Sequence, residues 1–193
     1  MILSEIAQVS TAMIFRDQAP KEDPHGSVRA LAIRDLVASK PLQWQDLPRI
    51  ALDEKYLQHC LRPGDVVIPS RGDYYKAWIF EGAGELVFPL GQLNIIRPSE
   101  CLDPRYLVWY LNRRATQDKM SLMLTGTSIK ALTKTALLTL EVEVPSLVRQ
   151  RQIAELNQTT QRIMAVRHRM NELDREEIAY LTNLVLQSGG ANA

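Results

Sequence analysis

The chain has 193 residues, of which 46% are hydrophobic and 23% charged, so a disordered or low-complexity chain is excluded. Its 23 Lys and Arg residues against 22 Asp and Glu residues give a net charge of +1, which neither supports nor excludes nucleic-acid binding. It shows no signal-peptide pattern, no apolar run of roughly 18 residues and no CxxC pair. We therefore expect a cytoplasmic protein with no membrane partner.

Short apolar segments between glycine-containing turns fill residues 1–145 and predict a mostly β domain. The predicted strand segments are 28–36, 65–73, 75–80, 85–90, 93–98 and 137–145. In the last of them every second residue is apolar, which is typical of a strand with one solvent-exposed face. One helix interrupts the pattern, because Asp103 and Pro104 form a helix start and apolar residues recur at helical spacing through Asn112.

The last 45 residues predict a long helix, because no Gly or Pro lies between Pro145 and Ser188. About 40 residues at ~1.5 Å each span ~60 Å, more than a small domain needs. An apolar stripe along it must be buried against another helix, which we expect to belong to another chain. A hairpin folded back onto its own domain is the alternative. The predicted dimer-interface residues are Leu156, Ile163, Val166, Met170, Leu173, Leu181 and Leu184.

Two short patterns resemble enzyme sites, but neither has the neighbouring structure or residue spacing that the chemistry requires. Residues 80–84 look like the glycine loop that binds S-adenosylmethionine, but a strand ending at Pro89 follows them instead of the required helix. Asp73 and Lys76 lie three positions apart, whereas metal-dependent nucleases set the acid and the lysine two apart. The histidines are isolated from one another. We therefore predict no catalytic residue, no metal site and no cofactor.

A series of short motifs, each weak alone, occurs in a fixed order and carries a resemblance to a known family. The motifs are AIRDL (32–36), LRPGDVVI (61–68), SRG (70–72), LNIIRP (93–98), LDPRYLVWYLN (102–112), TGTSIKAL (125–132) and LEVEVPSL (140–147), followed by Gln150 and Ile153. From about residue 28 onward the chain resembles one half of a type I restriction–modification specificity (S) subunit, which selects the DNA sequence in such systems.

The resemblance implies an α+β fold with a mostly β target recognition domain at 1–145 and a long dimerisation and spacer helix with a flexible tail at 146–193. Full-length members carry two recognition domains and two antiparallel helices, and each domain reads one half of a bipartite site. The implied partners are double-stranded DNA, DNA adenine methyltransferase subunits and a second copy of this chain; a translocase–nuclease subunit stays open.

Two departures from the family pattern bear on this interpretation. Residues 145–150 read Pro-Ser-Leu-Val-Arg-Gln where the family usually has Pro-Pro-Leu-x-Glu-Gln, and residues 15–26 lack the usual Ser-Gly-Gly-Thr-Pro turn. The alternative function is that of an S-like decoy or regulator, which occupies methyltransferase subunits without binding specific DNA. The near-neutral net charge favours this alternative.

Several polar segments are suited to DNA. Residues 125–128 offer hydroxyls and a glycine before a helix expected to begin near Ser128, which would carry lysines toward phosphates; a helix cap that satisfies its own amides is the alternative. An arginine in the 70–76 hairpin could bind guanine bidentately, unless the hairpin is only a solvated turn. The predicted DNA-contact residues are Arg16, Lys21, Arg71, Tyr74, Lys76, Thr125, Gly126, Thr127, Ser128, Lys130 and Lys134.

Overall fold

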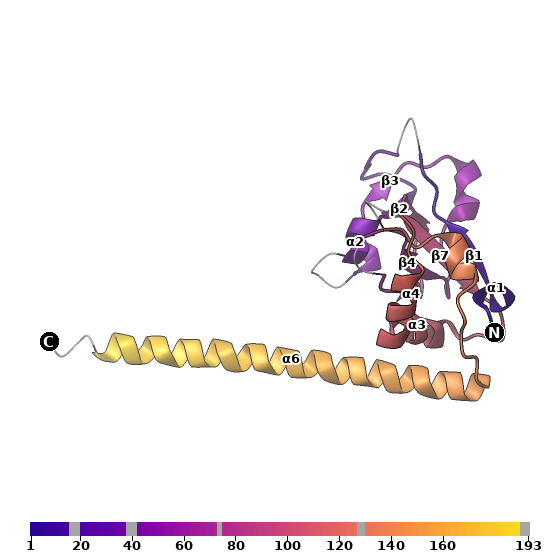
Figure 1. The fold of residues 1–193 in the computed structure, drawn as a ribbon. Coiled ribbons are helices and arrows are strands. Elements are labelled where there is room, and N and C mark those ends of the chain that lie inside the picture. The colour runs from indigo at the N-terminus through magenta and orange to yellow at the C-terminus, as the bar shows by residue number, and fades with distance from the viewer. Residues whose placement is uncertain (16–19, 38–41, 73–74, 127–129, 190–193) are drawn as a thin grey trace. The chain divides into compact units, whose positions relative to one another are not determined.

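The structure is a computed structural model that describes residues 1–15, 20–37, 42–72, 75–126 and 130–189. The chain divides into two compact units, Met1–Arg151 and Gln152–Ala193. Strands and short helices make up the first unit, and the long helix α6 (Leu147–Gly189) supplies the second (Figure 1). The prediction of an α+β fold that ends in a long helix is confirmed.

In the described residues the strands form two sheets. The larger sheet has the order β1-β7-β4-β5 and is antiparallel, while the smaller sheet, β3-β2-β6, pairs β2 with β6 in parallel. The strands are β1 (Ala7–Thr11), β2 (Val28–Leu31), β3 (Arg49–Ile50), β4 (Val66–Pro69), β5 (Trp78–Ile79), β6 (Val87–Pro89) and β7 (Leu93–Pro98). Because β1 pairs with β7, the start of the chain completes the larger sheet.

Short helices join and cover these strands. They are α1 (Leu3–Ile6), α2 (Ile33–Val37), α3 (Pro104–Asn112), α4 (Arg114–Leu122) and α5 (Lys134–Leu138), with 3-10 helices η1 (Trp44–Asp46) and η2 (Glu54–His59). The predicted start of α3 is confirmed, because the Asp103 carboxylate accepts hydrogen bonds from the backbone amides of Arg105 at 2.9 Å and Tyr106 at 3.1 Å. Pro104 occupies the first turn, where it needs no amide hydrogen.

Apolar side chains from both sheets meet in one core. Leu31 of β2, Val67 of β4 and Ile95 of β7 belong to the same buried cluster as Leu61 and Phe80. Burying a side chain of this size contributes about 1.5–3 kcal/mol relative to leaving it exposed. The first unit is therefore stabilised by contacts between its own residues.

Two of the predicted strand segments are helical in part. In segment 28–36 the chain leaves β2 and enters α2, because the Asp35 carboxylate accepts a hydrogen bond from the Ala32 amide at 2.8 Å and turns the backbone. Segment 137–145 was predicted to be a strand, and this is wrong: α5 extends to Leu138, and only an isolated bridge between Ile2 and Glu141 follows. Its alternating burial is nevertheless as expected, since Leu140 is buried and Glu141 exposed.

The first turn of α6 belongs to the first unit and is fixed there by Gln150. The Gln150 side chain is fully buried, accepts a hydrogen bond from the Asp103 amide at 2.7 Å, and donates to the carbonyl oxygens of Cys101 at 3.0 Å and Pro145 at 2.8 Å. Gln150, which belongs to the motif series quoted in the sequence analysis, thus satisfies backbone groups at the start of both α3 and α6.

Helix α6 continues without a break from Leu147 to Gly189, so the alternative of a hairpin is wrong (Figure 1). The side chains predicted to form a dimer interface are all exposed, from 43% at Leu184 to 69% at Leu156. In the part of the chain that the structure describes, α6 and the other helices are not long and apolar enough to cross a membrane.

Candidate nucleic-acid interface

Two segments that the sequence assigns separately to DNA contact lie against each other. Arg71, just after β4, forms an antiparallel bridge with Ala131, and Ala131 forms a second bridge with Thr125. Thr125 and Ala131 exchange backbone hydrogen bonds of 3.0 and 2.8 Å. Between them, Gly126 has a φ of 103°, a conformation that glycine adopts without strain. The fold therefore joins the backbone at Arg71 to the backbone at Thr125.

Further hydrogen bonds hold these segments together. The Leu132 amide donates to the Ser70 carbonyl oxygen at 2.9 Å, and the Tyr75 hydroxyl donates to the Lys130 carbonyl oxygen at 3.2 Å. From β7, the fully buried Asn94 side chain donates to the Leu132 carbonyl oxygen at 2.8 Å. Sequence reasoning missed Asn94, although a polar residue within the apolar segment 93–98 was a usable signal.

Basic side chains project from the joined segments. Arg71, Lys76, Lys130 and Lys134 are all exposed. Within the described residues none of them pairs with a carboxylate, whereas Lys76 lies with its ammonium 4.3 Å from the centre of the Trp78 ring. We call these four residues the basic cluster. Cations without carboxylate partners are suited to phosphate oxygens.

The helix expected to begin near Ser128 starts later in the chain. Lys130 lies outside any helix, and α5 begins only at Lys134. The cap is supplied by Thr133, whose hydroxyl oxygen accepts a hydrogen bond from the Ala136 amide at 3.1 Å. Lys130 and Lys134 therefore do not share a helix, and the bridge at Ala131 fixes the backbone beside Lys130 instead.

Of the other predicted residues in the described part of the chain, Lys21 lies apart from this cluster. The predictions at Arg16, Tyr74, Thr127 and Ser128 lie outside the described residues. Lys21 is exposed and belongs to the surroundings of the smaller sheet, because its neighbour Glu22 bridges to Ile50 of β3 and pairs with Arg34 at 2.8 Å.

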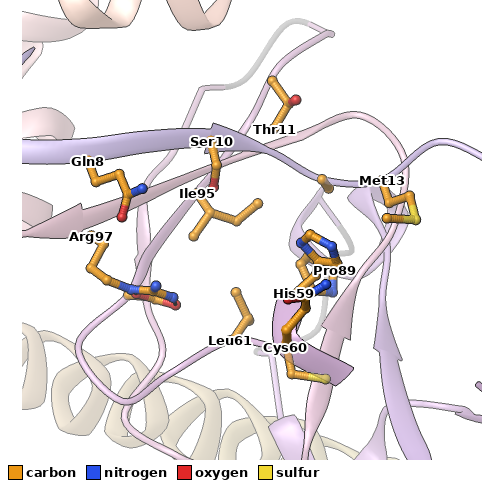
Figure 2. A pocket seen from close by; sticks show the side chains of 13 residues that line it. Gln8, Ser10, Thr11, Met13, His59, Cys60, Leu61, Pro89, Ile95 and Arg97 are labelled. Carbon is orange, nitrogen blue, oxygen red and sulfur yellow. Dashed lines mark hydrogen bonds and ion pairs between the residues drawn. The ribbon is translucent and has the colours of Figure 1, made fainter. Parts of the chain in front are cut away.

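A cavity of about 350 Å³ opens elsewhere in the first unit, and none of the predicted DNA-contact residues that the structure describes lines it. Figure 2 shows Gln8 and Arg97 on one side of it and His59 and Cys60 on the other. Arg97 forms a two-point ion pair with the buried Asp65, with both nitrogen–oxygen distances at 2.7 Å. The hydrogen bond to Asp65 raises the pKa of Arg97.

The cysteine in the lining of the cavity is not an activated nucleophile. Burial raises the pKa of the Cys60 thiol to about 11, which keeps it protonated at neutral pH. No group of three or more His, Cys, Asp or Glu side chains suited to a metal occurs among the described residues. The Asp65 carboxylate also accepts a hydrogen bond from the Arg62 amide at 2.8 Å, so it ties β7 to the turn before β4.

No protein-family model matches the sequence, and no curated protein matches it. The fold is nevertheless similar to those of solved specificity-subunit structures. One is described as the HsdS subunit from Thermoanaerobacter tengcongensis, with a TM-score of 0.60 and 20% identity over 86% of this chain and 38% of that one. Another is the S subunit of a type I restriction–modification system from M. genitalium, with a TM-score of 0.54 and 11% identity over 81% of this chain and 37% of that one.

A third similar chain comes from a structure that describes complex assembly and conformational transition of the type I restriction–modification system. Its TM-score is 0.62, with 20% identity over 91% of this chain and 41% of that one. The resemblance stated from the sequence is therefore confirmed at the level of the fold. The chain spans about two fifths of the length of these relatives.

Proposed function

We propose that the chain is a DNA sequence-specificity subunit of a type I restriction–modification system, without catalytic activity of its own. The observation that carries this proposal is the basic cluster, in which two separately predicted DNA-contact segments are joined by bridges through Ala131. The similarity of the fold to solved specificity subunits supports it. The first unit reads one half of a bipartite site in double-stranded DNA.

The basic cluster divides into two kinds of contact. Lys130 and Lys134 bind phosphates and set the position of the domain on the duplex. Arg71 is held by its bridge to Ala131 and carries a guanidinium that can bind guanine at two points, a contact that contributes about 1–3 kcal/mol of discrimination. Phosphate contacts supply affinity for any sequence, and Arg71 supplies the preference.

The second recognition domain comes from a second copy of the chain. The exposed apolar stripe of α6 supports this, because a helix with such a stripe buries it against another helix. Two identical domains about a two-fold axis predict an interrupted palindrome as the preferred site. The dimer recruits DNA adenine methyltransferase subunits.

Methylation sequencing tests the whole proposal. DNA from cells that carry this gene and its neighbours should contain a modified bipartite motif that disappears when the gene is deleted. A second test is a gene encoding Arg71→Lys with the stripe of α6 intact, which keeps the charge but loses the two-point contact. It should weaken or change the motif. A motif unaffected by deletion of the gene would refute the proposal.

The second candidate is an S-like decoy that binds methyltransferase subunits without specific DNA. The net charge of +1 favours it, because proteins that bind DNA by charge alone are usually more basic. The two candidates differ at low salt, where phosphate contacts are strongest. Binding of the purified chain to methyltransferase subunits, with no binding to any duplex at low salt, would establish the decoy.

A further inference from the structure

The segment that carries Lys76 is held in place by side chains of two helices that are far from it in sequence. The Asn112 side chain at the end of α3 pairs with both backbone groups of Ala77: its oxygen accepts from the amide at 2.8 Å, and its nitrogen donates to the carbonyl oxygen at 2.9 Å. The Gln117 side chain in α4 donates to the carbonyl oxygens of Tyr75 at 3.0 Å and Leu111 at 2.8 Å.

These bonds replace a strand ladder at the edge of the larger sheet. β5 is an edge strand that begins only at Trp78, so residues 75–77 lie beyond its pairing with β4. Tyr75 and Ala77 are buried while Lys76 between them is exposed. Asn112 and Gln117 fix the backbone on either side of Lys76. The Lys76 side chain therefore extends into solvent from a backbone position that is fixed.

Tyr75 connects these hydrogen bonds to Lys130 in the second predicted DNA-contact segment. Tyr75 is 5% exposed, and its hydroxyl donates to the carbonyl oxygen of Lys130 at 3.2 Å. Gln117 therefore fixes the backbone of Tyr75, and Tyr75 fixes the backbone of Lys130. Neither Asn112 nor Gln117 belongs to the basic cluster.

We infer that Asn112 and Gln117 are positioning residues for DNA discrimination, which set the geometry between Lys76 and Lys130 without touching DNA themselves. This inference rests on the proposed function. Binding by a segment that must first be ordered costs affinity, and a preordered segment avoids that cost. Lys76 adds to the preference that Arg71 supplies, because a lysine can also bind a guanine edge. A loosened Lys76 segment still attracts phosphates but favours one sequence less.

The test uses the full chain with the Gln117→Met substitution, which keeps the length of the side chain and removes its hydrogen bonds. The control is Gln58→Met, because Gln58 is exposed and donates to Lys55. The duplex preferred by the unsubstituted chain is first selected from a random pool. Affinity is then measured by fluorescence anisotropy for this duplex and for a permuted one, over a range of salt concentrations.

We expect Gln117→Met to lose about tenfold in affinity for the preferred duplex and much less for the permuted one. The slope of affinity against salt should stay unchanged, because the cations themselves are retained. A variant that only unfolds would lose both affinities together. Tyr75→Phe is the second variant: it keeps the buried ring, removes the bond to Lys130, and should also lower discrimination.

Amide exchange measured by NMR tests the geometry without DNA. The Ala77 amide should be protected in the unsubstituted chain and exchange faster in Asn112→Ala. If the unsubstituted chain prefers no duplex, the proposed function fails and this inference with it. If it prefers one, and folded Gln117→Met and Tyr75→Phe discriminate equally well, the inference alone is overturned.

Discussion

The first unit and the second unit place their apolar residues in opposite ways. In Met1–Arg151, side chains such as Val67 and Phe80 are buried in a common core. In Gln152–Ala193, the large apolar residues of α6 from Leu156 onward are exposed. A domain needs buried apolar surface to offset the loss of chain entropy. The first unit therefore contains its own core, whereas the apolar stripe of α6 is exposed in this chain.

The largest expected effect comes from placing charges in the stripe. Ile163→Asp combined with Met170→Asp would bury unpaired carboxylates in a helix–helix interface, at a cost of several kcal/mol, about 2–7 for each polar group. We expect monomers by light scattering where the unsubstituted chain gives dimers. The control is Gln158→Asp with Gln161→Asp, at polar positions outside the stripe. A dimer that persists in the stripe variant would refute association through α6.

The next effect concerns the first unit alone. Arg97→Met removes one partner of the ion pair with Asp65 and leaves a carboxylate that is 1% exposed without its arginine. The free energy of unfolding should fall by about 3 kcal/mol, measured by urea denaturation. The control is Arg105→Met, which removes the exposed pair with Glu81 and should cost under about 1 kcal/mol. Equal losses for the two variants would show that burial does not decide the strength of these pairs.

A smaller effect is expected at the DNA surface of the first unit. Lys130→Ala and Lys134→Ala should weaken binding to all duplexes alike, and each should flatten the log–log dependence of affinity on salt by roughly 0.9. Lys55→Ala is the control, because Lys55 is exposed and paired with Asp53 at 3.3 Å. A loss limited to one sequence would assign these lysines to bases instead of phosphates.

The two units also differ in how far the sequence predicts them. The long helix follows from residues 146–188 alone, because helix formers without Gly or Pro leave few alternatives. The capped start of α3 was equally local, since Asp103 and Pro104 are neighbours. Segment 137–145 was misassigned because Thr133 and the distant N-terminal residues decide its structure. The sequence pattern therefore predicts an element correctly where neighbouring residues determine it, as in α6 and at the start of α3. It is wrong where distant residues determine the structure, as in segment 137–145.

The candidate interface shows the same limit. The residue types around Arg71 and Thr125 indicated phosphate or base contact, but their juxtaposition depends on bridges through Ala131, which no spacing in the sequence reveals. Asn112 and Gln117 were missed for the same reason, because each acts on backbone more than 30 residues away in the chain.

The smallest expected effect is a difference in labelling rate between the two cysteines of the first unit. One cysteine lies in its interior and the other on its surface. Cys60 is 5% exposed and its pKa is raised by burial to about 11, whereas Cys101 is exposed. Thiolates are the reactive form, so at pH 8 the Cys60 thiol is ionised in roughly one molecule in a thousand. A thiol reagent should label Cys101 quickly in the native chain and Cys60 only after denaturation. Cys101→Ser should abolish the fast phase.

The same thiol predicts how stability changes in alkaline solution. Because the pKa of Cys60 is raised from 9.0 to about 11 by folding, the unfolded chain loses this proton first as the pH rises. The contribution of the buried thiol is therefore complete below pH ~9 and declines between pH ~9 and ~11. Cys60→Val should make the free energy of unfolding less dependent on pH in that window, measured by urea titration. An unchanged dependence, or fast native labelling of both thiols, would show that Cys60 is accessible to solvent and that the core of the first unit opens around it.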